Sequence, residues 1–133
     1  MRVAVIGSRE CGDLSVEEIL ARLPEGCTEI VSGGAIGVDR LAREAARRSG
    51  IPLREFLPDY QTFGRQAPLI RDQEIAAYAD EILAFWDFRS RGTRYTILQA
   101  LSKDKPVTIV NIDDPAGDAH TFPEEGGSHP DLS

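Results

Sequence analysis

Residues 1–112 of this 133-residue chain contain no histidine, and His120 and His129 both lie near the C-terminus. The absence removes the commonest general base of enzymes, and with it the Ser–His–Asp and Cys–His arrangements that activate a nucleophile. The acids close to the two histidines follow no known spacing of metal ligands. We therefore predict no metal site, and no motif in the chain indicates a resident cofactor.

Cysteine and long apolar runs are also scarce. Cys11 and Cys27 are the only cysteines, and they form no Cys-x-x-Cys pair, so neither a zinc site nor a disulfide framework is indicated. No apolar run approaches the roughly 18 residues that a membrane-spanning helix needs. Residues 1–10 indicate a first strand followed by a polar turn rather than a signal peptide. We expect a cytoplasmic location and no contact with a membrane.

Positive charge is confined to one part of the chain. Residues 1–110 hold all 15 Lys and Arg against 16 Asp and Glu, whereas residues 111–133 hold six acids and no Lys or Arg. The acidic total argues against broad nucleic-acid binding, which relies on many phosphate contacts. Because residues 113–133 are rich in Asp, Gly, Pro, His and Ser, we predict one domain over 1–112 and an acidic, flexible tail over 113–133.

Apolar periodicity predicts strands alternating with helices. Strands are expected at 3–6, 28–31, 52–57, 82–86 and 107–110, and helices at 16–23, 38–49, 68–79 and 93–102. In the second helix, Val38, Leu41, Ala42, Ala45 and Ala46 form one apolar stripe. This alternation predicts an α/β, Rossmann-like three-layer sandwich with a five-stranded parallel sheet in the order 3-2-1-4-5.

A glycine-rich turn joins the second strand to the second helix. Gly33, Gly34 and Gly37 let the backbone turn tightly and approach a ligand without a Cβ in the way. Backbone N–H groups at a helix start, together with the positive end of its dipole, form an anion site. In parallel sheets, ligands bind beyond the carboxyl ends of the strands. We therefore expect the loops after strands one, two and four to converge on one phosphate-bearing ligand.

The predicted ligand-binding residues all come from these loops and the helices that follow them. They are Gly7, Ser8, Arg9, Ser32, Gly33, Gly34, Ala35, Gly37, Asp39, Arg71, Asp87, Arg91, Gly92 and Thr93.

Carboxylates and aromatic residues are open to more than one interpretation. Asp87 and Asp39 are the candidate catalytic acids, with Glu74 a third acid of interest, but an acid such as Asp39 is also stabilised by its place in a first helical turn. Tyr60 and Phe63 either cover a nucleobase or anchor their loop.

Four motifs in order resemble the SLOG superfamily. They are Gly7-Ser8-Arg9, the stretch Val31–Arg40, Ile70-Arg71-Asp72, and Ala84–Asp87 with Ser90–Thr93. The resemblance is to small single-domain bacterial and phage members, and it covers roughly residues 1–110. It implies a Rossmann-like domain that binds a nucleotide or a nucleotide-derived ligand, and it implies a homodimer.

The superfamily offers three functional classes. In Lonely Guy phosphoribohydrolases, a Gly-Gly-x-Gly-Thr turn is followed by a catalytic glutamate. Here Ser90-Arg91 replaces the glycine pair and no glutamate follows Gly92-Thr93. DNA-processing protein A uses the fold within a larger and more basic assembly on single-stranded DNA. The leading prediction is therefore a protein that binds or senses a nucleotide, ahead of a nucleotide N-glycosidase and of a single-stranded DNA binder.

Overall fold

The computed structural model describes residues 1–123. Its strands are β1 (Arg2–Gly7), β2 (Glu29–Ser32), β3 (Leu53–Glu55), β4 (Glu81–Trp86), β5 (Val107–Asn111) and β6 (His120–Phe122). Its α-helices are α1 (Val16–Arg22), α2 (Val38–Ser49), α3 (Tyr60–Phe63), α4 (Ala67–Tyr78) and α5 (Arg91–Ser102), and a 3-10 turn, η1 (Gly64–Gln66), joins α3 to α4. Each predicted strand and helix is present, with its ends shifted by a few residues.

The sheet has the order β3-β2-β1-β4-β5-β6. The first five strands pair in parallel, so the predicted order 3-2-1-4-5 is confirmed. The sixth strand pairs antiparallel with β5, where Ile109 lies opposite His120. Because β1 and β4 are central, they run through the most deeply buried part of the molecule and carry the loops after them to the same edge of the sheet.

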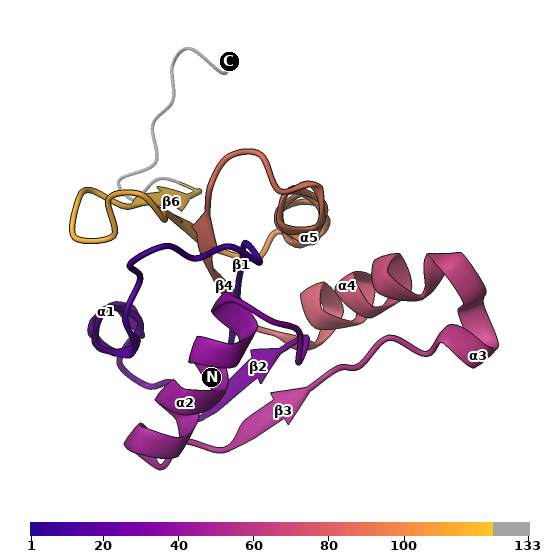
Figure 1. Cartoon of the computed structure of the whole chain (residues 1–133), viewed down its shortest axis with the longest axis horizontal. Coiled ribbons are helices and arrows are strands. Elements are labelled where there is room, and N and C mark those ends of the chain that lie inside the picture. The colour runs from indigo at the N-terminus through magenta and orange to yellow at the C-terminus, as the bar shows by residue number, and fades with distance from the viewer. Residues whose placement is uncertain (124–133) are drawn as a thin grey trace.

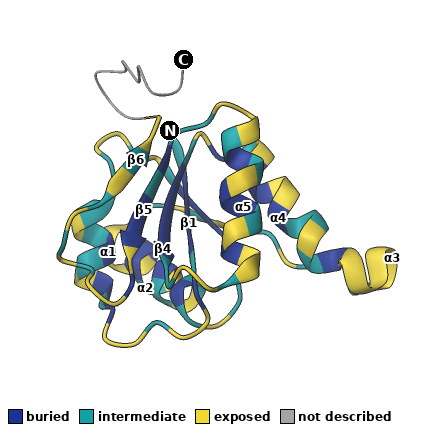
Figure 2. Cartoon of the chain, turned by 90° about the horizontal axis from the view of Figure 1, so that it is seen from above, coloured by how far each residue is buried: buried dark blue, intermediate teal, exposed yellow. Residues whose placement is uncertain are grey.

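Helices cover both faces of the sheet, α1 and α2 on one and α4 and α5 on the other (Figures 1 and 2). Alternate residues of one strand supply the two cores, since successive side chains point to opposite faces. Val3 and Val5 pack with the α1–α2 layer, whereas Ala4 and Ile6 pack with the α4–α5 layer. Both cores consist of apolar side chains, and polar groups gather at the ends of the strands.

The prediction of a flexible tail from residue 113 is wrong for residues 113–123. This segment turns back and forms β6, which the Thr108 and Thr121 hydroxyls, 2.9 Å apart, help to hold in register. Arg22 of α1 donates to the Pro115 carbonyl at 2.8 Å and also to that of Gly117, which fixes the turn before β6. Composition pointed to a tail because a three-residue strand is too short to show a period. Residues 124–133, including His129, lie outside the described residues.

Within residues 1–123, no helix has the length and apolar character needed to cross a membrane.

One segment stands away from the body of the protein: α3 and η1 project beyond the N-terminal end of α4 (Figure 2). Neither element contains a buried residue, and Tyr60 and Phe63 are exposed on it.

Gly37 is the position where the fold most needs a glycine. Its φ is +75°, and an added Cβ would overlap the carbonyl oxygen of Arg9 and lie 2.5 Å from that of Ser8. The loop after β1 therefore passes directly over the start of α2. This close approach brings the loops after β1 and β2 together.

Gly37→Ala should destabilise the protein by about 2–4 kcal/mol, because a strained φ and a backbone overlap add. Gly50 is the matched control, since its φ is +73° but nothing lies within 4 Å of an added Cβ. Gly50→Ala should cost only about 1 kcal/mol. Urea unfolding of both variants measures the difference. Equal losses would mean that the approach of the two loops contributes nothing.

Candidate functional site

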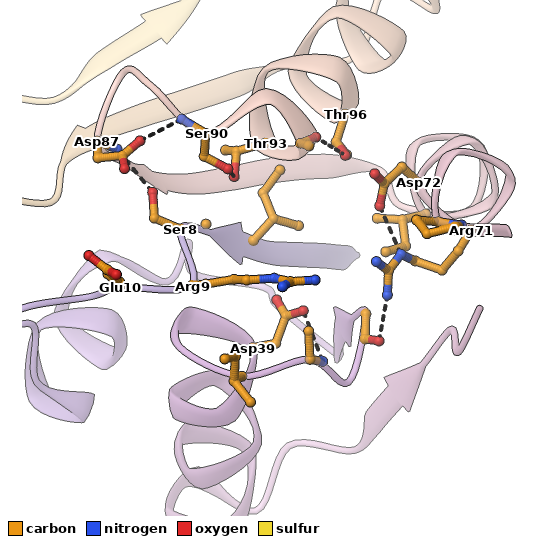
Figure 3. Close-up of a pocket in the computed structure, with 18 residues that line it drawn as sticks. Ser8, Arg9, Glu10, Asp39, Arg71, Asp72, Asp87, Ser90, Thr93 and Thr96 are labelled. Atoms are coloured by element: carbon orange, nitrogen blue, oxygen red, sulfur yellow. Dashed lines mark hydrogen bonds and ion pairs between the residues drawn. The ribbon is translucent and has the colours of Figure 1, made fainter. Parts of the chain in front are cut away.

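A cavity of about 480 Å³ opens at the carboxyl ends of β1, β2 and β4. Its walls come from the loops after those three strands and from α4 and α5 (Figure 3). Its lining is about equally polar and apolar, and Ile6, Ile36, Pro68 and Ile75 supply much of the apolar surface. The loops after β1, β2 and β4 therefore meet at one cavity, as the sequence predicted.

Ser8 joins the three parts of the wall. Its N–H donates to the Phe85 carbonyl at 3.2 Å, and its own carbonyl accepts from the Val38 N–H at 3.2 Å. Its hydroxyl oxygen accepts from the Asp87 N–H at 3.1 Å. The side chain is buried, so these bonds are shielded from water and hold the end of β4 and the start of α2 against the loop after β1.

Asp87 organises the β4–α5 loop. One carboxylate oxygen accepts from the Ser90 N–H at 2.7 Å and from the Arg89 N–H at 2.8 Å. These two bonds lower the pKa of Asp87, because they favour the charged form. An ionised, doubly bonded carboxylate is a poor proton donor, so Asp87 acts here chiefly as the support of the loop.

The start of α5 faces the cavity. Ser90 precedes its first turn without making a side-chain capping bond, and that turn contains no acid. The Ser90 and Thr93 hydroxyls lie 3.1 Å apart and both line the cavity, as does Gly92. The first N–H groups of a helix have no partner within it, and an uncapped start leaves them available to an anion.

The glycine-rich turn uses its donors differently. The Gly34 N–H donates to the Ser32 hydroxyl at 3.3 Å, and the Ala35 N–H donates to Asp39 at 3.1 Å. Two N–H groups of the predicted phosphate turn are therefore already bonded within the protein. The turn is also fastened to α4, because the Arg71 guanidinium donates to the Gly33 carbonyl at 2.8 Å.

Two carboxyl groups at this end of the cavity have raised pKa values. Burial raises the pKa of Asp39 to about 6, although the Ala35 N–H and the nearby Arg71 favour its charged form. Burial also raises the pKa of Asp72, whose ion pair with Arg71 at 2.8 Å acts in the opposite direction. With a pKa of about 6, a fraction of Asp39 is protonated near neutral pH, and this fraction is able to donate its proton.

Arg9 lines the cavity, and its side chain extends across it (Figure 3). Its side chain forms no ion pair with any carboxylate in residues 1–123. A guanidinium without an internal partner is the natural group to meet an anion that enters from solvent.

The structure brings most of the predicted residues together. The cavity is lined by Gly7, Ser8, Arg9, Gly33, Ala35, Asp39, Arg71, Asp87, Gly92 and Thr93. Four others lie outside the cavity lining. Ser32 is buried at the end of β2, and Gly34 packs against Leu57. Gly37 lies at the crossing under Arg9, and Arg91 is exposed on α5.

Sequence reasoning missed four polar residues of the lining, Glu10, Asp72, Ser90 and Thr96. Asp72 and Ser90 both stand inside motifs quoted above, next to residues that were selected. Thr96 lies three residues after Thr93, so both face the same side of α5. Helical spacing from Thr93 was the signal that would have found it. The third acid of interest, Glu74, is exposed on α4 and does not line the cavity.

No group of three or more His, Cys, Asp or Glu side chains in residues 1–123 is placed to hold a metal ion.

Trp86 lies outside the cavity lining. Its ring packs on Phe88, and its indole N–H donates to the Ser90 carbonyl at 3.0 Å.

Residues 1–63 match the family model YAcAr, the YspA, cpYpsA-related SLOG family. The resemblance to the SLOG superfamily is confirmed. No curated protein matches the sequence.

Solved structures with similar folds include two DNA processing protein A chains. The protein from Streptococcus pneumoniae superposes with a TM-score of 0.69 at 22% identity, over 83% of this chain and 50% of that one. The protein from Helicobacter pylori, described by its single-stranded DNA binding mode, gives 0.66 at 24%, over 84% of this chain and 65% of that one. This chain therefore spans between half and two thirds of these relatives. The structural-genomics protein TM1055 superposes with a TM-score of 0.62 at 23% identity, over 80% of this chain and 71% of that one. At such identities these likenesses establish the Rossmann-like fold.

The raised pKa of Asp39 should make stability fall as pH rises. The carboxyl titrates near 3.8 when unfolded and at about 6 when folded, so the folded state holds more protons between these values. The free energy of unfolding should then drop by about 1 kcal/mol between pH 5 and pH 7.5. Asp39→Asn keeps an oxygen for the Ala35 N–H but cannot titrate, so it should lose this part of the pH dependence. Urea unfolding at both pH values measures this change in the free energy of unfolding. The same change in the variant and in the wild type would contradict the raised pKa.

Proposed function

We propose that this protein binds a nucleotide or a nucleotide-derived small molecule in the cavity at the ends of β1, β2 and β4. The observation that carries the proposal is that one cavity contains both the start of α5, which has no side-chain cap, and the guanidinium of Arg9, which forms no ion pair within residues 1–123. Together they offer backbone N–H donors, hydroxyl donors and a positive charge to a single anionic group. The volume of about 480 Å³ is of the size that small-molecule sites have.

The other end of the cavity suits the uncharged part of such a ligand. Asp39, Asp72 and Thr96 offer acceptors to sugar hydroxyls or to the amino groups of a base. Ile6 and Ile75 give this end an apolar wall against which a ring can lie. We propose that the phosphate lies at the α5 start and that the sugar and base extend toward α4.

The proposal refines the predicted role of the glycine-rich turn. Since the Gly34 and Ala35 N–H groups are bonded within the protein, the α5 start is the better phosphate site. The turn then shapes the cavity wall, and Arg71 holds it at a fixed distance from α4.

Purified protein incubated with nucleoside monophosphates, NAD, ADP-ribose and cyclic nucleotides should retain at least one of them intact. Mass spectrometry of the retained and free fractions identifies it. Arg9→Gln should then weaken binding about tenfold, because it removes the charge that meets the phosphate. Arg94→Gln, on an exposed part of α5 outside the cavity, is the matched control and should bind normally. Equal binding by both variants would remove Arg9 from the site, and retention of nothing would overturn the proposal.

A second candidate function is hydrolysis of the N-glycosidic bond of the bound nucleotide, and the raised pKa of Asp39 favours it. A protonated carboxyl donates its proton to the leaving base as the glycosidic C–N bond breaks, and water adds to the anomeric carbon. The proton that the water gives up restores the carboxyl, and a free base and a sugar phosphate are released. Asp72, also with a raised pKa, is the second acid in the cavity.

The two candidates separate in the same incubation. Release of free base over time, abolished in Asp39→Asn while the nucleotide is still retained, would establish hydrolysis. A ligand that stays intact for hours would leave binding as the function.

The homodimer implied by the resemblance stays a prediction. Exposed apolar side chains are available on the projecting segment and beside it, at Leu57, Tyr60, Phe63 and Leu69.

A further inference from the structure

A second cavity, of about 740 Å³, lies along α2, with Arg9 also in its lining. Its charged lining consists of Arg9, Arg40, Arg43, Arg47 and Arg48 with a single acid, Glu44. We call these residues the arginine groove. The positions 40, 43 and 47 follow helical spacing, so their side chains form a row along one face of α2.

Several of these arginines form ion pairs, but none of the pairs is buried. Arg43 contacts Glu55 at 2.9 Å, and Arg48 contacts Glu17 at 2.6 Å, while Arg47 and Arg48 share Glu44. These pairs are partly exposed to solvent, so each contributes little stability and an entering phosphate can replace the carboxylate. Arg9 and Arg40 form no ion pair with any acid in residues 1–123. The groove therefore has positive charge to offer.

The charged side chains that line the two cavities are mostly of opposite sign. The first contains the carboxylates of Glu10, Asp39, Asp72 and Asp87 and only two arginines, of which Arg71 is already paired. A ligand with several negative charges meets repulsion there beyond its first phosphate. Arg9 lines both cavities, so a chain of phosphates that begins in the first is able to continue into the groove.

We propose that the arginine groove is a second phosphate site and that the ligand is the phosphorylated end of a short oligonucleotide. This inference rests on the proposed function for the terminal nucleotide, which enters the first cavity. The following phosphates lie along α2. A nucleoside triphosphate fits less well, because its charges sit on adjacent phosphorus atoms, whereas Arg40 and Arg47 are about 10 Å apart along the helix axis.

The test is a length series of 3′-fluorescein-labelled, 5′-phosphorylated random-sequence deoxynucleotides of one, two and four residues, with unlabelled ATP as competitor. Fluorescence anisotropy is measured for wild type, Arg40→Gln, the double variant Arg40→Gln/Arg47→Gln, and the exposed control Arg94→Gln. Thermal melts check that each variant folds. Glutamine favours helix about as well as arginine, so α2 should persist in the variants.

The tetranucleotide should bind wild type about tenfold more tightly than the mononucleotide, with a steeper dependence on salt. In the double variant this advantage should fall to about twofold, and the salt slope should decrease by about one for each arginine removed. Binding of the mononucleotide should not change in Arg40→Gln.

Each of the other outcomes would contradict a different part of the inference or of the proposed function. Equal affinity for all lengths overturns the inference and leaves the proposed function standing. A length advantage that survives in the double variant places the phosphates elsewhere. ATP that competes with the tetranucleotide and depends on Arg40 would identify a polyphosphate ligand instead. Failure of every probe to bind overturns the inference, whereas the proposed function falls only if the panel of nucleotides described above is not retained either.

Discussion

The arrangement of the site depends on the hydrogen bonds of one buried residue, Ser8. Its N–H, carbonyl and hydroxyl each hold a different neighbour: the end of β4, the start of α2 and the first residue of the β4–α5 loop. A buried bond lost at such a point leaves a polar group without a partner, which costs more than the bond itself contributes. The close passage of the loop over Gly37 adds a steric requirement to the same junction. Three segments distant in sequence are thereby held in fixed register before any ligand arrives.

The junction explains why polar chemistry gathers on one side of the molecule. The apolar layers on the two faces of the sheet leave no room for carboxyl groups, so Asp39 and Asp72 stand where the strands end. There they are partly buried against the glycine-rich turn and α4, and desolvation raises the pKa of each. Arg71 moderates this effect by pairing with Asp72 while it also bonds the Gly33 carbonyl. One side chain thus sets both the shape and the charge of that end of the cavity.

Local sequence patterns predicted the alternation of strands with helices, and the Rossmann-like strand order and the convergence of the loops followed from that alternation. Continuous apolar strands and the 3.6-residue stripe of α2 are visible in any short window. The short β6 strand was missed, because its pairing depends on β5 and on Arg22, which are distant in sequence. The state of individual donors was equally invisible. That Asp39 takes the Ala35 N–H, or that Asp87 folds its own loop, follows from side-chain directions that no spacing encodes.

The distribution of charge at the site runs against the net charge of the chain. The sequence is acidic overall, at −7, and that total argued against broad nucleic-acid binding. Association depends on the local field rather than on the sum, and arginines on one face of a helix create a positive strip that distant acids screen only weakly at low salt. Across Arg9, the surface changes from a cavity dominated by carboxylates to a groove dominated by guanidinium groups. The ligand that we propose has one neutral end and one charged end, so this difference in charge between the two surfaces would favour one orientation of the bound ligand over the other.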